Sequence, residues 1–349
     1  MRMIDSHFHW RPRAVLDYLC TRKDYPRAAP NSKGGYTYWR TEGGRPLSNC
    51  GEEWFDLDAQ MKHMDTISPG MGVVCSVGPF TVSFSDFVGE EGRKIANIWN
   101  DQMVEGQRRY PGRFWGTAAV PLGDTKLALE VLDHAILDLG LVGVNLPGSI
   151  GGDPHIDTAR LEPFYDRVEE LGVPLFLHPT DGIYEDILDG DNGALYLSLG
   201  RVVDLSVSAY RLVLSGIMER HPKLKLFISH TGGALPYQAG RMDKNSGAAK
   251  LPQKPSVYLK RMYTDTVSPH MAGIKFAIDF YGVDHIMYGS DYPCWSPAAA
   301  VKYFNETGMS QEDQEKIFYH NVRRFMNLRD PAPVQAKQQH DAREPVPAK

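Results

Sequence analysis

The sequence predicts an α/β fold in which eight strands and their intervening helices close into a (β/α)8 barrel. Short apolar runs rich in β-branched and aromatic residues recur along the chain, and segments of helical period separate most of them. Parallel neighbours need crossover connections, and eight strands is the number that closes such a barrel. An open doubly wound sheet is the alternative, but no GxGxxG motif follows any of the eight runs.

The predicted elements alternate along the chain. The strand segments are 3–10, 72–78, 114–121, 141–147, 173–179, 224–230, 261–267 and 285–291. The helical segments are 58–67, 84–110, 125–140, 158–172, 201–221, 271–282 and 311–326. Gly140 and Gly172 follow the last turns of two of these helices, where glycine commonly ends a helix.

Two segments lie outside this alternation. Residues 23–54 are rich in glycine, proline and aromatic residues and have no period. A loop of this length in a compact domain is usually functional or disordered, and its aromatic content argues against disorder. We therefore expect a flap or small subdomain, inserted after the first strand and helix. The segment 329–349 has four prolines and no aromatic residue, so we expect one barrel domain over 1–328 and a flexible tail.

Composition excludes several classes of partner. The formal net charge of −5 gives no electrostatic reason to expect nucleic acid or an anionic membrane surface. No apolar run approaches the roughly 20 residues of a membrane span, and the N-terminus lacks the pattern of a signal peptide. The four cysteines form no CxxC pair, which favours reduced thiols. We expect a cytoplasmic protein.

Polar residues mark the ends of several predicted strands. In a barrel of this kind the reactive face lies at the C-terminal ends of the strands. The residues found there are His7, His9, His178, His230 and Asp291. His7 and His9 point to the same side, because residues i and i+2 of a strand share a face. Three imidazoles and a carboxylate suit a zinc-like divalent ion, and one further histidine would then be free for acid/base work.

Each of these motifs also has an ordinary explanation. An HxH at a strand end is often incidental, and the "GSDYP" of 289–293 consists of turn-forming residues. Their joint placement at four different strand ends favours a metal site.

The motifs resemble those of the amidohydrolase superfamily. They are the HxH of the first strand, "LHP" on the fifth, "SHTGG" after the sixth and "GSDYP" on the eighth. The resemblance covers residues 3–327 and is strongest to the branch that includes aminocarboxymuconate semialdehyde decarboxylase and the γ-resorcylate-type decarboxylases. It implies a distorted (β/α)8 TIM barrel with one catalytic metal, commonly zinc, with manganese also possible. By this resemblance the ligands would be His7, His9, His178 and Asp291, with His230 as the acid/base and Asp291 also part of the catalytic machinery.

The end of the fourth strand indicates the number of ions. Members of the superfamily with two metals typically bridge them with a modified lysine at this position. Here the chain reads "VNLPG" over 144–148, without a lysine, so we expect one ion. Asp5 lies on the same side of the first strand but further from its end, which predicts a supporting role.

The resemblance also bears on the substrate and the assembly. Members of the branch act on planar carboxylates. Arg241 follows His230 by eleven residues, close to three helical turns. In the decarboxylase the matching arginine crosses a subunit boundary to hold a substrate carboxylate, so we expect a homodimer or higher homo-oligomer. The second substrate arginine of the decarboxylase has no clean match, and Arg40, Arg45 and Trp39 of the flap are the candidates for substrate contacts.

These observations predict a metal-dependent, non-oxidative decarboxylase of an aromatic or unsaturated, ring-cleavage type carboxylic acid. The same residues would also serve hydrolysis of a C–C, lactone or amide bond in a similar carboxylate. A catalytically silent barrel that binds a carboxylate is the remaining alternative.

Overall fold

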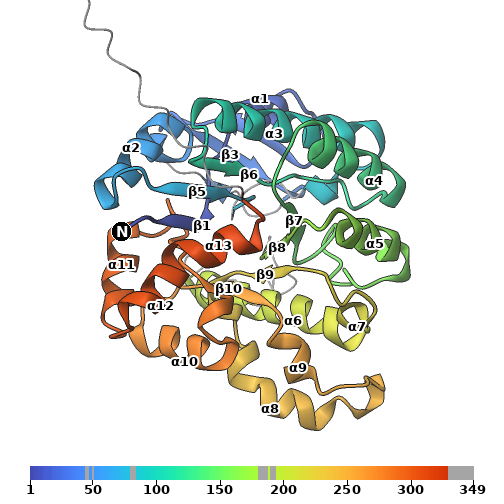
Figure 1. Cartoon of the computed structure of the whole chain (residues 1–349). Helices are drawn as coiled ribbons and strands as arrows, with labels where there is room; N and C mark the ends of the chain where they lie inside the picture. The colour runs from blue at the N-terminus through green and yellow to red at the C-terminus, as the bar shows by residue number, and fades with distance from the viewer. Residues whose placement is uncertain (44–46, 49–50, 79–83, 180–187, 189–193, 329–349) are drawn as a thin grey trace, which may run out of the picture.

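Eight short parallel strands form the centre of the computed structural model, which describes residues 1–43, 47–48, 51–78, 84–179, 188 and 194–328. The strands are β1 (Ile4–Phe8), β5 (Gly72–Cys75), β6 (Phe114–Gly116), β7 (Val144–Pro147), β8 (Leu175–His178), β9 (Leu226–Ile228), β10 (Tyr263–Asp265) and β11 (Ile286–Met287). Figure 1 shows them surrounded by helices. Each corresponds to one predicted strand, but each is shorter than its predicted segment.

The strands close into a ring through two weak joints. They pair as β1-β5-β6 and as β11-β10-β9-β8-β7. A single parallel bridge between Ala118 and Val144 joins β6 to β7. At the other joint, Phe8 bridges to Tyr292, and the Ser6 amide donates to the Tyr288 carbonyl at 2.8 Å. The predicted (β/α)8 barrel is therefore confirmed, and its distortion lies where isolated bridges replace full ladders.

The helices follow the strands around the ring. They are α1 (Arg13–Cys20), α2 (Leu57–Ile67), α3 (Gly89–Arg109), α4 (Thr125–Asp133), α5 (Glu162–Leu171), α6 (Arg201–Leu214), α7 (Ile217–Arg220), α8 (Leu235–Asn245), α9 (Pro255–Leu259), α10 (Met271–Tyr281), α11 (Pro297–Asn305), α12 (Gln311–Glu315) and α13 (Asn321–Phe325). Short 3-10 helices lie at Glu52–Trp54, Phe84–Asp86, Ala159–Leu161, His230–Gly232, Gly247–Ala249 and Val283–His285, and π-helical turns at His134–Asp138, Tyr196–Gly200 and Lys316–His320. Of these helices, α1, α8, α9 and α11 lie outside the predicted helical segments.

Local sequence explains where several helices begin and end. The carboxylates of Asp56 and Asp124 accept hydrogen bonds from the first turns of α2 and α4, as N-cap residues do. Gly172 ends α5 with a φ of 67°, a left-handed conformation that glycine adopts without a steric cost. The α4 helix buries Leu127, Ala128, Val131 and Leu132, which share one helical face.

A small apolar cluster forms the floor beneath the predicted site. It combines residues of the strands with residues at and just after α13: Ile4, Val74, Phe176, Phe227, Met287, Val322, Phe325 and Met326. The Phe227 ring lies 6.2 Å from that of His7. Figure 1 shows α13 lying across the near end of the barrel. That end is therefore covered, and the strand ends that carry the predicted site lie at the other.

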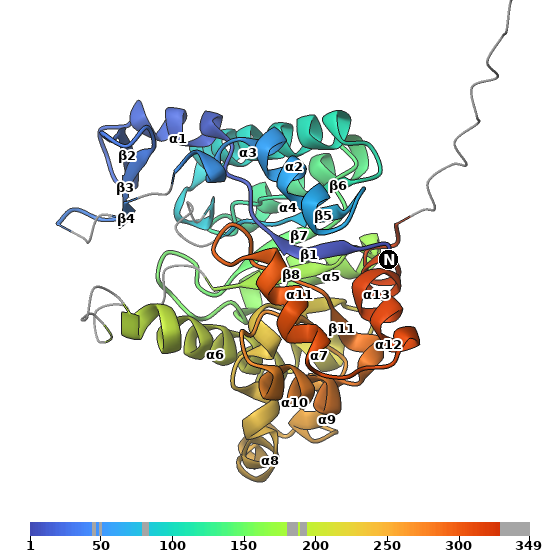
Figure 2. The same ribbon diagram turned by 90° about the vertical axis from the view of Figure 1, so that its left-hand side faces the viewer.

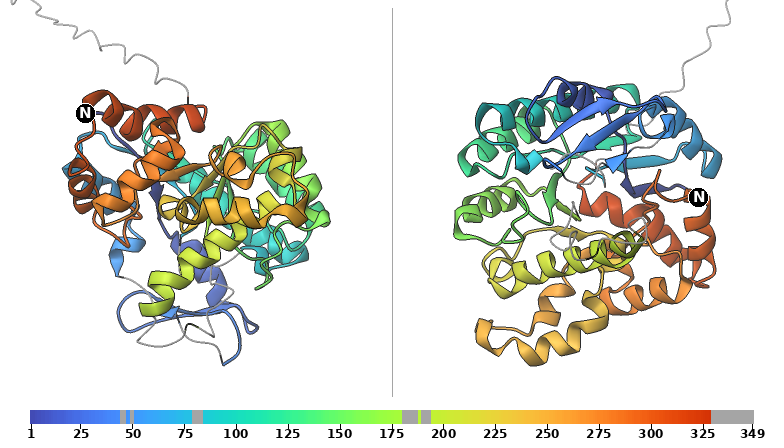
Figure 3. Two further views of the ribbon diagram at one scale, coloured as in Figure 1. Left: turned by 90° about the horizontal axis from the view of Figure 1, so that it is seen from below. Right: turned by 180° about the vertical axis from the view of Figure 1, so that it is seen from behind.

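The segment 23–54 contains a sheet that the sequence did not predict. β2 (Arg27–Pro30), β3 (Tyr36–Trp39) and β4 (Leu47–Ser48) pair in an antiparallel sheet. Figure 2 shows this sheet at the end of the barrel to which the C-termini of the strands point, and Figure 3 (right) views that end. The predicted tail, 329–349, lies outside the described residues. No helix in the described part of the chain has the length and apolar character needed to cross a bilayer.

Candidate metal centre

Four buried side chains meet at the C-terminal ends of the strands. His7 and His9 come from β1 and the residue after it, His178 ends β8, and Asp291 follows β11. One ligand atom from each lies within 4.8 Å of the other three. The four predicted ligands, 284 residues apart at the extremes, are therefore brought together as one group that can hold a metal ion.

Each imidazole is held so that Nε2 is the atom left for a metal. The Nδ1 of His9 lies 3.1 Å from the Ser76 carbonyl oxygen, and that of His178 lies 2.9 Å from the Pro179 carbonyl oxygen. A carbonyl only accepts, so both Nδ1 atoms donate. The Nδ1 of His7 donates in the same way to the Asp265 carboxylate at 2.6 Å. In a neutral imidazole the other nitrogen then carries the lone pair, as in metal-ligating histidines generally.

The lone pairs converge where a cation fits. The Nε2 atoms of His7 and His9 lie 3.1 Å apart, and the Nε2 of His9 lies 3.0 Å from Oδ1 of Asp291. The buried Nε2 of His178 has no hydrogen-bond partner among the described residues. Acceptors crowded together in this way repel one another, and a divalent ion bound to three nitrogens and one oxygen relieves the repulsion. The donor set suits one such ion.

Burial and charge set the pKa values of the ligands. Burial favours the neutral imidazole and lowers the pKa of His9 and His178. Burial also opposes ionisation of Asp291, but the neighbouring histidines, His7 first, outweigh it and lower the pKa of Asp291 to about 2. For His7, burial acts against the proton, yet the carboxylates of Asp291 and Asp265 outweigh burial and raise its pKa. The carboxylates that favour a proton on His7 also favour a metal cation.

His230 lies beside the four ligands. Its ring centroid is 5.1 Å from that of His7 and 5.4 Å from that of His178. Burial lowers its pKa to about 4, so the ring is neutral at pH 7 in the protein alone. A neutral imidazole next to a metal site can accept a proton and pass it on, which is the geometry that acid/base work requires.

The backbone is strained at this end of the barrel. His230, Thr231 and Asp291 have φ values of 55°, 54° and 58°, which non-glycine residues rarely adopt. Such conformations cluster at functional sites, where the surrounding structure enforces them. At His230 and Thr231 the enforcing group is Asp265, whose carboxylate accepts from both backbone amides.

Asp265 is the residue that sequence reasoning missed. Its carboxylate accepts from the amides of His230 at 3.0 Å, Thr231 at 2.9 Å and Val267 at 3.0 Å, as well as from His7. It therefore fixes both a candidate ligand and the strained turn that carries His230. The available signal was its position at the end of the seventh barrel strand, equivalent to the other site residues.

Two further buried residues support the site. Asp5 accepts from the amides of His7 and Ser290, each at 3.0 Å, and from the Ser290 hydroxyl. It joins β1 to the residues that precede Asp291, and burial raises its pKa to about 7. Within β7, Asn145 donates to the Ala118 carbonyl at 2.8 Å and accepts from the Val77 amide at 2.9 Å. Neither β7 nor Gly148 after it supplies the lysine that would be needed there to bridge a second ion.

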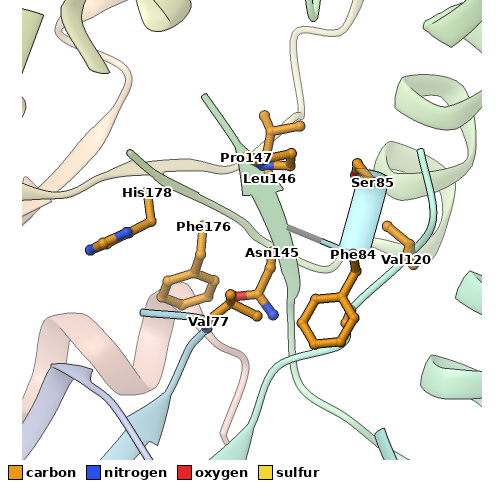
Figure 4. A pocket seen from close by; sticks show the side chains of 10 residues that line it. Val77, Phe84, Ser85, Val120, Asn145, Leu146, Pro147, Phe176 and His178 are labelled. Atoms are coloured by element: carbon orange, nitrogen blue, oxygen red, sulfur yellow. The ribbon is translucent and has the colours of Figure 1, made fainter. Parts of the chain in front are cut away.

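Two cavities flank His178. One, of about 580 Å³, lies between α6 and the loops after β9, β10 and β11, and His178, His230 and Asp291 line it. The other is a void of about 20 Å³, room for about one water molecule. Figure 4 shows its lining, in which Phe84, Val120 and Asn145 face His178 and Phe176. Only the larger cavity has the size of a binding site for a small organic molecule.

The predicted substrate residues lie elsewhere. Arg241 is exposed on α8 and does not line the larger cavity. Arg40 forms a two-pronged ion pair with Asp86, at 3.0 and 3.2 Å. Trp39 packs against Arg27, whose Cζ lies 5.6 Å from the ring centroid. Neither Arg40 nor Trp39 lines the cavity, and Arg45 lies outside the described residues. Of the residues 23–54, Trp54 reaches the cavity.

The fold and the metal-binding group define the class of protein. The family model described as Amidohydrolase matches residues 4–328, and the chain belongs to this family. It is an enzyme of the amidohydrolase superfamily, in the branch that the motifs predict.

The chain is similar to particular enzymes of known reaction within this superfamily. The gamma-resorcylate decarboxylase of Rhizobium sp. (strain MTP-10005) is 30% identical over 303 residues, which cover 80% of this chain and 91% of that protein. A 2-keto-4-carboxy-3-hexenedioate hydratase of Sphingobium sp. (strain NBRC 103272 / SYK-6) is 26% identical over 270 residues, covering 70% and 76%. The crystal structure of 2,6-dihydroxybenzoate decarboxylase from Rhizobium is 25% identical, with a TM-score of 0.77, and the match covers 94% of this chain and 99% of that one.

Proposed function

We propose that this enzyme is a non-oxidative decarboxylase of an aromatic or unsaturated carboxylic acid, dependent on one divalent ion, zinc or manganese. His7, His9, His178 and Asp291 would hold the ion. The observation that carries the proposal is the fixed set of imidazoles, whose Nδ1 atoms are engaged and whose Nε2 atoms converge beside a fifth polar residue, His230. The similarity to gamma-resorcylate decarboxylase supports this reaction and this class of substrate.

The ion, His230 and Asp265 would have separate roles in this reaction. A bound divalent ion supplies a fixed positive charge that polarises an oxygen of the substrate. His230 takes up a proton and delivers it to the ring carbon that bears the carboxylate. The bond from that carbon to the carboxylate then breaks, CO2 leaves, and the electron pair of the bond stays with the ring. Asp265 holds His230 in place through the backbone amides of the turn.

The test is an assay of metal-loaded protein on a panel of hydroxybenzoates and unsaturated dicarboxylates. We expect one CO2 for each molecule of decarboxylated product, and none from metal-free protein. A product that keeps every carbon and gains water would contradict the proposal. That outcome would indicate hydrolysis, or hydration as in the Sphingobium relative.

We also propose that the functional unit is at least a homodimer in which Arg241 reaches a neighbouring subunit's site. Its exposure on α8, away from its own cavity, supports this. Mixing Arg241→Ala subunits with His230→Ala subunits should restore part of the turnover, because one site of each mixed dimer regains both residues. Mixed dimers that form but stay inactive would contradict it.

Residues 23–54 are proposed to cover the mouth of the cavity. Trp54 supports this, because it lines the cavity from that segment. Amide hydrogen exchange in this segment should slow when a tight-binding carboxylate is added. Unchanged exchange there would count against the proposal.

A further inference from the structure

A buried arginine faces the cavity that contains the candidate metal centre. Arg201 is the first residue of α6 and follows the π-helical turn Tyr196–Gly200. It is 6% exposed, and it lines the cavity of about 580 Å³ together with His178, His230 and Asp291. Figure 2 shows the start of α6 at the end of the barrel to which the strands point.

The guanidinium is anchored next to a metal-ligand candidate. Its Nη1 donates to the Pro179 carbonyl oxygen at 3.3 Å. The same oxygen accepts from Nδ1 of His178 at 2.9 Å. The guanidinium also lies over the ring of Tyr196, with Cζ 5.5 Å from the centroid. One carbonyl oxygen therefore sets the position of both the arginine and the imidazole.

Arg201 brings a positive charge to the cavity that His178 and His230 also line. Among the described residues that line this cavity, Arg201 is the one arginine or lysine. The arginines expected from the sequence, Arg40 and Arg241, do not line it. An anionic substrate entering this cavity meets Arg201 as well as the metal.

The His178 imidazole separates the guanidinium of Arg201 from the position where the candidate ligands would hold a metal ion. Nδ1 and Nε2 are on different sides of the His178 ring. The Nδ1 side is bonded to the carbonyl that Arg201 shares, and the Nε2 side faces the other ligands. This separation suits two anionic groups on one planar molecule better than a single carboxylate. The planar fork of a guanidinium matches a carboxylate with two parallel hydrogen bonds.

We propose that Arg201 binds a second anionic group of the substrate, so that the enzyme prefers acids with a carboxylate in addition to the group held at the metal. This inference rests on the proposed function, because it takes the large cavity as the substrate site. It names a dicarboxylate as the substrate class and assigns the second carboxylate to the chain's own α6.

The test compares two unreactive probes of matched ring size, benzoate and isophthalate, by calorimetric titration of metal-loaded protein. Arg201→Gln should weaken isophthalate binding by at least about tenfold, the effect of about one charged hydrogen bond, and leave benzoate binding within about twofold. Arg201→Lys should lie between, because lysine keeps the charge but not the fork. The matched control is Arg211→Gln on the same helix. Arg211 pairs with Asp157 at 2.8 Å and does not line the cavity, so both affinities should stay unchanged.

The metal content and the thermal unfolding midpoint of each variant are measured together with these titrations. Unchanged isophthalate binding in Arg201→Gln, or an equal loss for both probes, would overturn the assignment. If Arg201→Gln loses its metal, Arg201→Lys carries the test, and a lysine variant that retains both metal and full isophthalate affinity would also overturn it. Titration needs no turnover, so failure of the enzyme to release CO2 would refute the proposed reaction alone. Release of CO2 with no effect of Arg201 would refute this inference alone.

Discussion

The two sides of the barrel mouth differ in charge and in space. The ends of β1, β8, β9, β10 and β11 carry titratable residues: His7, His9, His178, His230, Asp265 and Asp291. β5, β6 and β7, with the residues just after them, carry uncharged ones, among them Val77, Thr117 and Asn145. The charged side lines a cavity of about 580 Å³, whereas the cavity beside the neutral side has only about 20 Å³.

The difference shows that one part of the ring of strands stabilises the fold while the other part forms the candidate metal site. On the neutral side the polar groups are used internally: the Thr117 hydroxyl donates to the Cys75 carbonyl at 2.8 Å and Asn145 bridges neighbouring strands. On the charged side, hydrogen bonds from the Nδ1 atoms of the three imidazoles fix the rings and leave their Nε2 atoms for a metal ion. A metal needs fixed donors with an open approach, and only the charged side combines the two.

The largest expected effect is loss of the metal from the charged side. His178→Ala removes the nitrogen that has no partner among the described residues, and three donors remain. Loss of a direct ligand should exceed the roughly 10–100-fold cost of losing an outer partner. Elemental analysis after dialysis should therefore find the variant empty and inactive. A variant that retains stoichiometric metal would remove His178 from the ligand set.

His230→Ala separates proton transfer from metal binding. We expect full metal content, because the four ligands remain, and turnover lowered by at least about 100-fold, the lower range for a general acid/base. Elemental analysis and CO2 release measured on one preparation test both. If the variant loses its metal, His230 belongs with the ligands instead.

Asp265→Asn should weaken the site without abolishing it. The amide keeps the shape of the side chain but loses the charge that holds His7 and the turn of residues 230–231. Metal affinity should fall by about 10–100-fold, as for other outer partners of metal ligands. Competition with a chelator measures it. Wild-type affinity in this variant would show that the position of His7 does not depend on the carboxylate.

Asn145→Ala should act on stability alone. It removes the acceptor of the buried Val77 amide, just after β5, at a cost of about 1–3 kcal/mol in the free energy of unfolding, whereas the Ala118 carbonyl keeps the Asn145 backbone amide as a donor. Metal affinity should be unchanged, since the four candidate ligands all come from the charged side. Urea unfolding measures the stability of the variant and metal titration measures its affinity. A large loss of metal affinity would show that the neutral side also contributes to metal binding.

The convergence of the four candidate ligands was predictable because they stand at or near the ends of apolar runs. His7, His178 and Asp291 each close such a run, and the topology of a parallel barrel brings these ends together. Every predicted strand except 141–147 extends too far at its C-terminus. There the chain leaves the ladder, and at His230 and Asp291 it takes positive φ values that no residue pattern announces.

Other features depend on contacts that the sequence does not reveal. Asp265 also closes a run, but a single aspartate after a strand is common in turns. Arg201 begins a predicted helix, where an arginine is normally exposed, and its burial depends on the packing of α6 over the strand ends. The strands of residues 27–48 are two to four residues long, too short for alternation to be recognised beside their glycines and prolines.

The joint between β1 and the segment after β11 has a consequence for biosynthesis. The His9 amide donates to the Tyr292 carbonyl, and the Asp291 amide donates to the His7 carbonyl, at 2.9 and 2.8 Å. These bonds join residues nearly 300 positions apart, the kind of long-range pairing that slows folding. A ribosome must therefore release almost the whole chain before the ring closes. His7 and His9 cannot meet Asp291 until that residue has been synthesised, so an ion held by all four residues could not bind a nascent chain that lacks it.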